Sequence, residues 1–89
     1  MSPERKFEKR LVELAKKHGW YCRKVKWIGR RGAPDRLLIS DWGRRTWIEL
    51  KSPGKKPDKL QEREHAEMRK FGENVRVIDS MEGVEALFA

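Results

Sequence analysis

The sequence predicts an α/β fold in which a mixed four-stranded sheet is flanked by helices. Segments with helical and strand-like periodicity follow one another in the order αβββαβα. The second and third strands form a hairpin, whereas a helix separates the third strand from the fourth, so that the last connection is a crossover. With 89 residues, of which 37% are hydrophobic, the chain is expected to form a single domain over residues 1–89.

The N-terminal part is expected to contain one helix and one strand. The helix covers residues 2–18, because Ser2 suits the N-cap, Pro3 suits the first helical position and Gly19 can end it. Its apolar stripe consists of Phe7, Leu11, Leu14 and Ala15. Residues 20–28 alternate imperfectly between polar and apolar side chains, which indicates a strand.

A hairpin and a crossover complete the predicted sheet. Residues 36–40 and 46–51 are apolar runs joined by a short turn, and a glycine- and proline-containing loop precedes them. Asp58 and Gln61 form a capping-box pattern at the start of the next helix, which Gly72 ends. A last strand at 74–79 and a final helix capped by Ser80 follow.

The hairpin gathers three chemically active side chains. Glu49 and Lys51 lie two residues apart on one strand, so both leave the same face of the sheet. A three-residue loop at 42–44 would set Asp35 opposite Lys51 on that face. An even-numbered loop would set Asp35 opposite Leu50, on the other face. The odd-numbered loop also pairs Ile39 with Trp47, which keeps large apolar side chains together, and it is therefore favoured.

Two carboxylates and an ammonium at one place suit the hydrolysis of a phosphodiester bond. Neighbouring carboxylates repel, and a divalent cation relieves that repulsion. The oxygen ligands favour Mg²⁺, with Mn²⁺ as a substitute. Lys51 could orient the attacking water or stabilise the developing negative charge.

Three motifs carry a family resemblance. RRGAPDR at 30–36, IELK at 48–51 and LQ at 60–61 resemble the PD-(D/E)XK nuclease pattern, and more narrowly its VRR-NUC (virus-type replication-repair nuclease) branch. In that branch G-x-P-D is followed by E-x-K and then by a glutamine, and the resemblance covers nearly the whole chain. It implies a restriction-endonuclease-like αβββαβ(α) core. It also implies a metal-dependent DNA endonuclease of phage or mobile-element replication, recombination or repair.

The resemblance also implies roles for individual residues. Asp35 and Glu49 would bind the metal together with the backbone carbonyl of Leu50, Lys51 would be the catalytic lysine, and Gln61 would lie beside the site.

The family also tends to place a glutamate of the first helix near the metal. Glu8 is chosen because it lies one residue off the stripe made by Phe7 and Leu11, and Glu4 and Glu13 remain alternatives.

Each assignment has a structural alternative. Asp35 could merely stabilise the turn after the proline, and Glu49 and Lys51 could form the solvated face of an edge strand. Gln61 already has a role as the capping-box partner of Asp58, so its contribution to catalysis is expected to be secondary.

The charge of the chain indicates a polyanionic partner. Lys and Arg number 22 against 14 Asp and Glu, which gives a net charge of +8. Cations on the two loops beside the proposed site suit phosphate contacts. They are Arg30, Arg31, Arg36, Lys55, Lys56 and Lys59. A non-catalytic DNA- or RNA-binding module and an accessory subunit of a larger complex are the competing hypotheses.

The remaining features concern location and assembly. Cys22 is the only cysteine, and no membrane span or signal peptide is apparent, so we expect a protein of the reducing cytoplasm, bacterial or phage-infected. Trp27 and Trp42 are hard to bury within one subunit. Stand-alone members of the resembling family are commonly homodimers acting on branched DNA, in the manner of Holliday-junction resolvases. We therefore expect a homodimer and a branched or structured DNA substrate.

Overall fold

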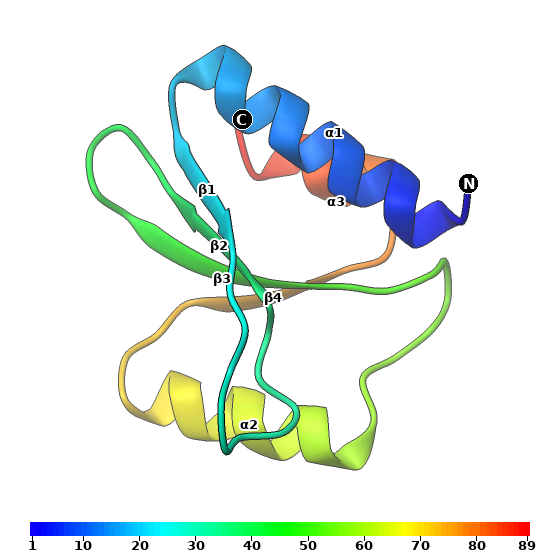
Figure 1. Cartoon of the computed structure of the whole chain (residues 1–89), viewed down its shortest axis with the longest axis vertical. Helices are drawn as coiled ribbons and strands as arrows, with labels where there is room; N and C mark the ends of the chain where they lie inside the picture. The colour runs from blue at the N-terminus through cyan, green and yellow to red at the C-terminus, as the bar shows by residue number, and fades with distance from the viewer.

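The computed structural model describes residues 1–89 and contains three helices and four strands (Figure 1). In chain order they are α1 (Pro3–His18), β1 (Tyr21–Lys24), β2 (Arg36–Ile39), β3 (Arg45–Leu50), α2 (Lys59–Lys70), β4 (Val75–Ile78) and α3 (Met81–Ala86). This is the predicted order of elements. No helix is long and apolar enough to cross a membrane.

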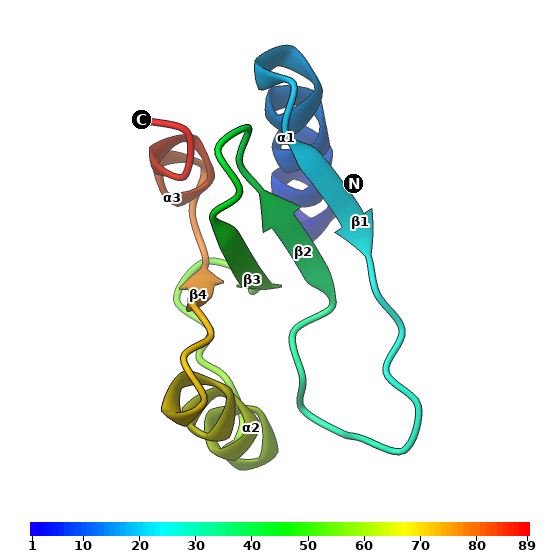
Figure 2. The same cartoon turned by 90° about the vertical axis from the view of Figure 1, so that its left-hand side faces the viewer.

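The four strands form one mixed sheet in the order β1-β2-β3-β4 (Figure 2). The first two pairs are antiparallel, and β3 pairs with β4 in parallel through the α2 crossover. Helices α1 and α3 lie on one face of the sheet and α2 lies on the other (Figure 1). The predicted mixed four-stranded sheet flanked by helices is therefore confirmed.

The main core lies between α1, α3 and the sheet. The predicted stripe of α1 is buried there, against side chains of β2, β3, β4 and α3. The buried residues of this core are Phe7, Leu11, Leu14, Ala15, Leu38, Ile48, Ile78 and Val84. Full burial of one such large side chain stabilises the fold by roughly 1.5–3 kcal/mol.

Strand β1 is shorter than expected, because its predicted range of 20–28 shrinks to Tyr21–Lys24. The amide of Val25 still donates to the carbonyl of Asp35 at 2.8 Å. The residue that precedes Asp35 is Pro34, which has no N–H to extend the ladder. The chain therefore leaves the sheet and forms a loop over residues 25–35.

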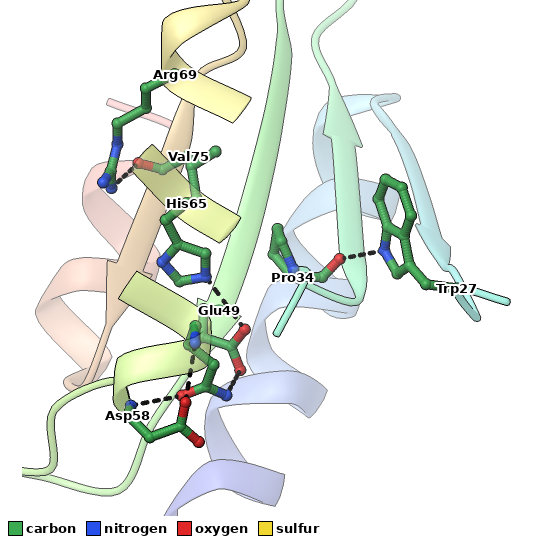
Figure 3. A network of polar contacts seen from close by, with 8 residues as sticks. Trp27, Pro34, Glu49, Asp58, His65, Arg69 and Val75 are labelled. Carbon is green, nitrogen blue, oxygen red and sulfur yellow. Dashed lines mark hydrogen bonds and ion pairs between the residues drawn. The ribbon is translucent and has the colours of Figure 1, made fainter. Parts of the chain in front are cut away.

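This loop is held firmly against the rest of the molecule. The indole Nε1 of Trp27 donates to the carbonyl oxygen of Pro34 at 2.8 Å (Figure 3). The Trp27 ring also packs on Trp47, with 5.3 Å between the ring centroids. Gly32 has a φ of +82° and lies so close to α2 that a Cβ would stand 2.6 Å from the carbonyl oxygen of Leu60. These contacts fix the backbone that leads into Asp35.

The register of the hairpin differs from the expected one by two residues. Arg36 pairs with Ile48, so Asp35 adjoins Glu49 rather than Lys51. The connection is five residues long, because Ser40 closes the turn: its amide donates to the carbonyl of Arg44, and its hydroxyl accepts from the amide of Arg44, both at 3.0 Å. The loop length is still odd, which keeps Asp35 on the expected face.

Candidate active site

The centre of the site is Glu49, near the end of β3 on the face toward α2. Asp35 precedes β2 and is the neighbour of Glu49 across the hairpin. Both side chains line an open cleft together with Glu4 and Glu8 of α1, and the cleft is almost entirely polar. Leu50 lines the same cleft. The structure thus brings together the two predicted acidic residues and two of the three glutamates considered on the first helix, whereas Glu13 lies outside the cleft and pairs with Arg10 at 3.7 Å.

The start of α2 holds one oxygen of the Glu49 carboxylate. The predicted capping box is present: Asp58 Oδ1 accepts from the amide of Gln61 at 2.9 Å, and Gln61 Oε1 accepts from the amide of Asp58 at 3.0 Å. Because the carbonyl end of Gln61 is used by the cap, its Nε2 is free to donate to Glu49 Oε2, at 3.3 Å. One side chain therefore caps the helix and orients the acid.

A further residue of α2 faces the other oxygen of Glu49. His65 Nε2 lies 3.6 Å from Glu49 Oε1 (Figure 3). Burial, and then the cations Arg69 and Lys51, lower the pKa of His65, which favours the neutral ring. No functional role was predicted for this residue from the sequence. The signal that could have revealed it is its spacing from Gln61, one helical turn earlier on the same face.

Glu49 lies in an unusually acidic environment. Burial raises its pKa to about 7, and the negative charges of Asp35, Asp58 and Glu4 act in the same direction. Lys51 opposes them, because its ammonium favours the ionised carboxylate. A half-buried carboxylate with three acidic neighbours creates a place where a cation is strongly favoured.

Lys51 lies directly beyond β3, and its amide donates to the carbonyl of Ile78 at 2.9 Å, so the strand geometry continues through it. Its side chain is half-buried and leaves the same face as Glu49. Its charge acts both on Glu49 and on His65. The predicted lysine is therefore close enough to both groups to influence their ionisation.

The two α1 glutamates that line the cleft have different partners. Glu4 Oε1 accepts from the amide of Ser52 at 3.2 Å and from its hydroxyl at 3.3 Å. Glu8 is paired with Arg36 at 3.2 Å and with Lys24 at 3.7 Å. The choice of Glu8 stays a prediction. Its charge is already balanced by two cations, which makes Glu4 the stronger candidate for direct contact with a metal.

The donor set fits a metal that keeps most of its water ligands. No three Asp, Glu, His or Cys side chains lie close enough together to form a complete metal-binding cluster. Asp35 and Glu49 nevertheless place two carboxylates in the cleft, and Leu50, whose backbone carbonyl is the third predicted ligand, lines the same cleft. Mg²⁺ is usually held by one or two carboxylates and completes its shell with water and phosphate oxygens. The residues present therefore fit Mg²⁺ better than Zn²⁺.

The predicted DNA-binding cations divide into free and paired side chains. Arg31, Lys55, Lys56 and Lys59 are exposed. Arg30 is exposed but donates to Glu64 on α2 at 3.0 Å. Arg36 differs from expectation: its side chain is only 12% exposed and is bound to Glu8, so it is not a free cation. It follows Asp35 in an extended strand and therefore points to the opposite face.

Other cations lie next to the cleft. Lys24, Lys26 and Arg30 line a hollow that Asp35 also lines. Because Asp35 and Lys24 also line the acidic cleft, the two depressions are neighbours.

An α/β core that brings an aspartate beside an E-x-K strand is the architecture of restriction-endonuclease-like nucleases. No family model matches the chain. A curated relative, "Putative nuclease p44" of Acyrthosiphon pisum secondary endosymbiont phage 1, is 42% identical over 79 residues, which are 89% of this chain and 85% of the relative. A solved structure described as a VRR_NUC domain has a TM-score of 0.90 and 37% identity, covering 99% of this chain and 96% of that one. The chain therefore belongs to the VRR-NUC family of nucleases, and its restriction-endonuclease-like fold is confirmed.

Proposed function

We propose that this protein is a Mg²⁺-dependent endonuclease that hydrolyses phosphodiester bonds in branched or structured DNA. The observation that carries the proposal is the pairing of Asp35 with Glu49 in one acidic cleft, close to the charge of Lys51. A non-catalytic binding module would have no use for a half-buried carboxylate whose pKa is raised by burial and by acidic neighbours.

Asp35, Glu49 and the carbonyl of Leu50 would hold the metal, and Mn²⁺ could replace Mg²⁺. When bound, Mg²⁺ would neutralise phosphate charge and lower the pKa of a water in its shell. Gln61 keeps the Glu49 carboxylate in place through its bond to Oε2. Glu4 or Glu8 would complete the acidic wall of the cleft from the α1 side.

Lys51 would act on the reacting phosphate. The oxygen of a water forms a new bond to phosphorus, and the bond between phosphorus and the leaving ester oxygen breaks. The ammonium of Lys51 would donate hydrogen bonds to the attacking water or to a non-bridging oxygen, where negative charge grows in the transition state. The attacking water releases a proton to solvent, and the leaving oxygen takes one up from solvent.

The DNA would lie along the cations that border the cleft. Lys24, Lys26 and Arg30 line the hollow next to Asp35, and Lys55 and Lys56 belong to the loop that follows the catalytic lysine. Contacts of this kind position a backbone without reading bases. A substrate recognised by shape, such as a four-way junction, suits such a surface better than a specific base sequence.

Cleavage of a labelled four-way junction tests this function. We expect the wild-type protein to cut the junction with Mg²⁺ or Mn²⁺, to cut a linear duplex of the same sequence more slowly, and to cut neither in EDTA. Asp35→Asn serves as the inactive control, because it removes one carboxylate charge with little change of shape. Binding without cleavage under every metal condition would support the non-catalytic module instead, and equal activity of Asp35→Asn would refute the site.

We also propose that the protein acts as a homodimer, since a four-way junction offers two equivalent strands for cutting. Trp42 is 71% exposed in the β2–β3 turn, and Phe71 is 75% exposed at the end of α2. Both of these segments lie on the left-hand side of Figure 1. We expect sedimentation equilibrium of the wild type to give twice the 10.6 kDa mass of the chain. The Trp42→Asp variant should give the mass of a single chain. A wild-type protein that sediments as a single chain would contradict the dimer.

A further inference from the structure

His65 is the most deeply buried polar side chain near the site, with 1% of its surface exposed. Its Nε2 atom is fully buried and has no hydrogen-bond partner. A buried polar nitrogen without a partner destabilises a fold, so such an atom needs a structural or functional reason. The group that can give this nitrogen a partner is the carboxylate of Glu49, whose Oε1 is 3.6 Å away.

The other oxygen of Glu49 is already bound. Gln61 Nε2 donates to Glu49 Oε2, whereas Oε1 faces only His65 from α2. Gln61 and His65 are four residues apart and lie on the same face of the helix. A small movement of either side chain would bring the imidazole and the carboxylate within hydrogen-bond distance. Gln61 and His65, on consecutive turns of α2, therefore face the two different oxygens of the Glu49 carboxylate.

We propose that His65 is a positioning residue, whose Nε2–H holds Glu49 Oε1 and sets the orientation of the carboxylate toward the metal. The inference rests on the proposed function, because it assigns a role at the same site. A neutral imidazole has one N–H, and donation from Nε2 leaves Nδ1 as the acceptor. Groups that orient a metal-binding carboxylate in this way typically change metal affinity by about 10- to 100-fold when removed.

The affinity for Mn²⁺ alone, measured by EPR of the free ion in the absence of DNA, tests the proposal. We expect His65→Phe, which keeps a ring but no donor, to weaken Mn²⁺ binding about tenfold. His65→Gln, whose amide nitrogen can take the place of Nε2, should restore most of the affinity. Met68→Ala is the matched control: Met68 is buried on the same helix, so its loss should lower the melting temperature and leave Mn²⁺ affinity unchanged.

Several results would overturn the proposal. One is a His65→Phe variant that binds Mn²⁺ as tightly as the wild type. Another is an equal loss of Mn²⁺ affinity in His65→Gln and His65→Phe, because a merely structural role predicts no rescue by an amide. If His65→Phe does not fold, ¹⁵N NMR of the histidine rings of the metal-free wild type tests the contact between His65 and Glu49 instead. We expect protonation at Nε2 and a shift of its signal in Glu49→Gln, and a ring protonated at Nδ1 alone would refute the contact.

These readouts are separate from catalysis. A protein whose Mn²⁺ affinity depends on His65 but that leaves DNA intact would defeat the nuclease function and keep the positioning role. A protein that cuts DNA, and whose His65→Phe variant binds Mn²⁺ normally, would keep the nuclease function and defeat the positioning role.

Discussion

Replacing Lys51 with alanine is expected to lower the rate of DNA cleavage by about a thousandfold, since the loss of one preorganised donor at a developing charge costs about 10²–10³ in rate. Two effects combine in this variant. The donor to the water or phosphate is lost, and Glu49 loses the cation that favours its ionised form. Single-turnover cleavage of a labelled junction with saturating Mg²⁺ measures the rate. Equal rates for Lys51→Ala and the wild type would remove Lys51 from the mechanism.

Two further variants separate position from charge. Lys55→Ala removes an exposed lysine of the following loop, so it should weaken DNA binding slightly and leave the saturated rate unchanged. Lys51→Arg keeps the positive charge but not the compact ammonium, and we expect most of the activity to be lost as well. A fully active Lys51→Arg variant would mean that Lys51 acts only as a diffuse positive charge.

The fold was largely predictable because capping residues in the sequence indicate where its helices begin and end. Ser2 and Gly19 bound α1 as expected, and the Asp58–Gln61 capping box starts α2 as expected. The register of the hairpin was not predictable in detail. It depends on the bonds of Ser40 with Arg44, which set these two residues opposite each other, whereas the expected loop set Asp41 opposite Arg45. Only the odd loop length, and with it the face of Asp35, followed from the pattern.

The candidate site was likewise predictable only in part. The proximity of Asp35, Glu49 and Lys51 followed from strand periodicity and the hairpin. The same periodicity indicates that Arg36 must point away from Asp35, and its burial beside Glu8 agrees with that rule. His65 was not identified, because a histidine in an apolar stripe resembles an ordinary core residue until its neighbours in space are known.

Glu49→Gln is expected to stabilise the metal-free protein at pH 8 while it abolishes cleavage. The carboxylate of Glu49 is only 13% exposed and lies near three other acids, so its charge is unfavourable when no cation is bound. A neutral amide of the same size removes that charge. Thermal unfolding at pH 8 in EDTA, followed by circular dichroism, measures the gain.

The sign and the pH range follow from the shifted pKa. The pKa of Glu49 in the folded protein is about 7, above its ordinary value of 4.5, so the folded state holds this proton more tightly than the unfolded state. Below pH 4.5 the residue is protonated in both states and costs nothing. Stability then falls as the pH rises from 4.5 through 7 and levels off above it. The full cost corresponds to about 3 kcal/mol, and we expect Glu49→Gln to recover about 2 kcal/mol, since an amide in the cleft still loses some hydration.

The comparison between two pH values makes this prediction specific. The variant and the wild type should unfold at similar temperatures at pH 4, and the variant should be the more stable at pH 8. Mg²⁺ should then raise the melting temperature of the wild type at pH 8, because only the folded state offers the paired carboxylates, and should leave Glu49→Gln nearly unchanged. An equal difference at both pH values would mean that the amide improves packing, and a less stable variant at pH 8 would mean that the charge of Glu49 is already balanced without a metal. The expected pattern would instead identify the carboxylate as a group that weakens the fold until a cation binds, so that metal affinity and fold stability depend on the same charge.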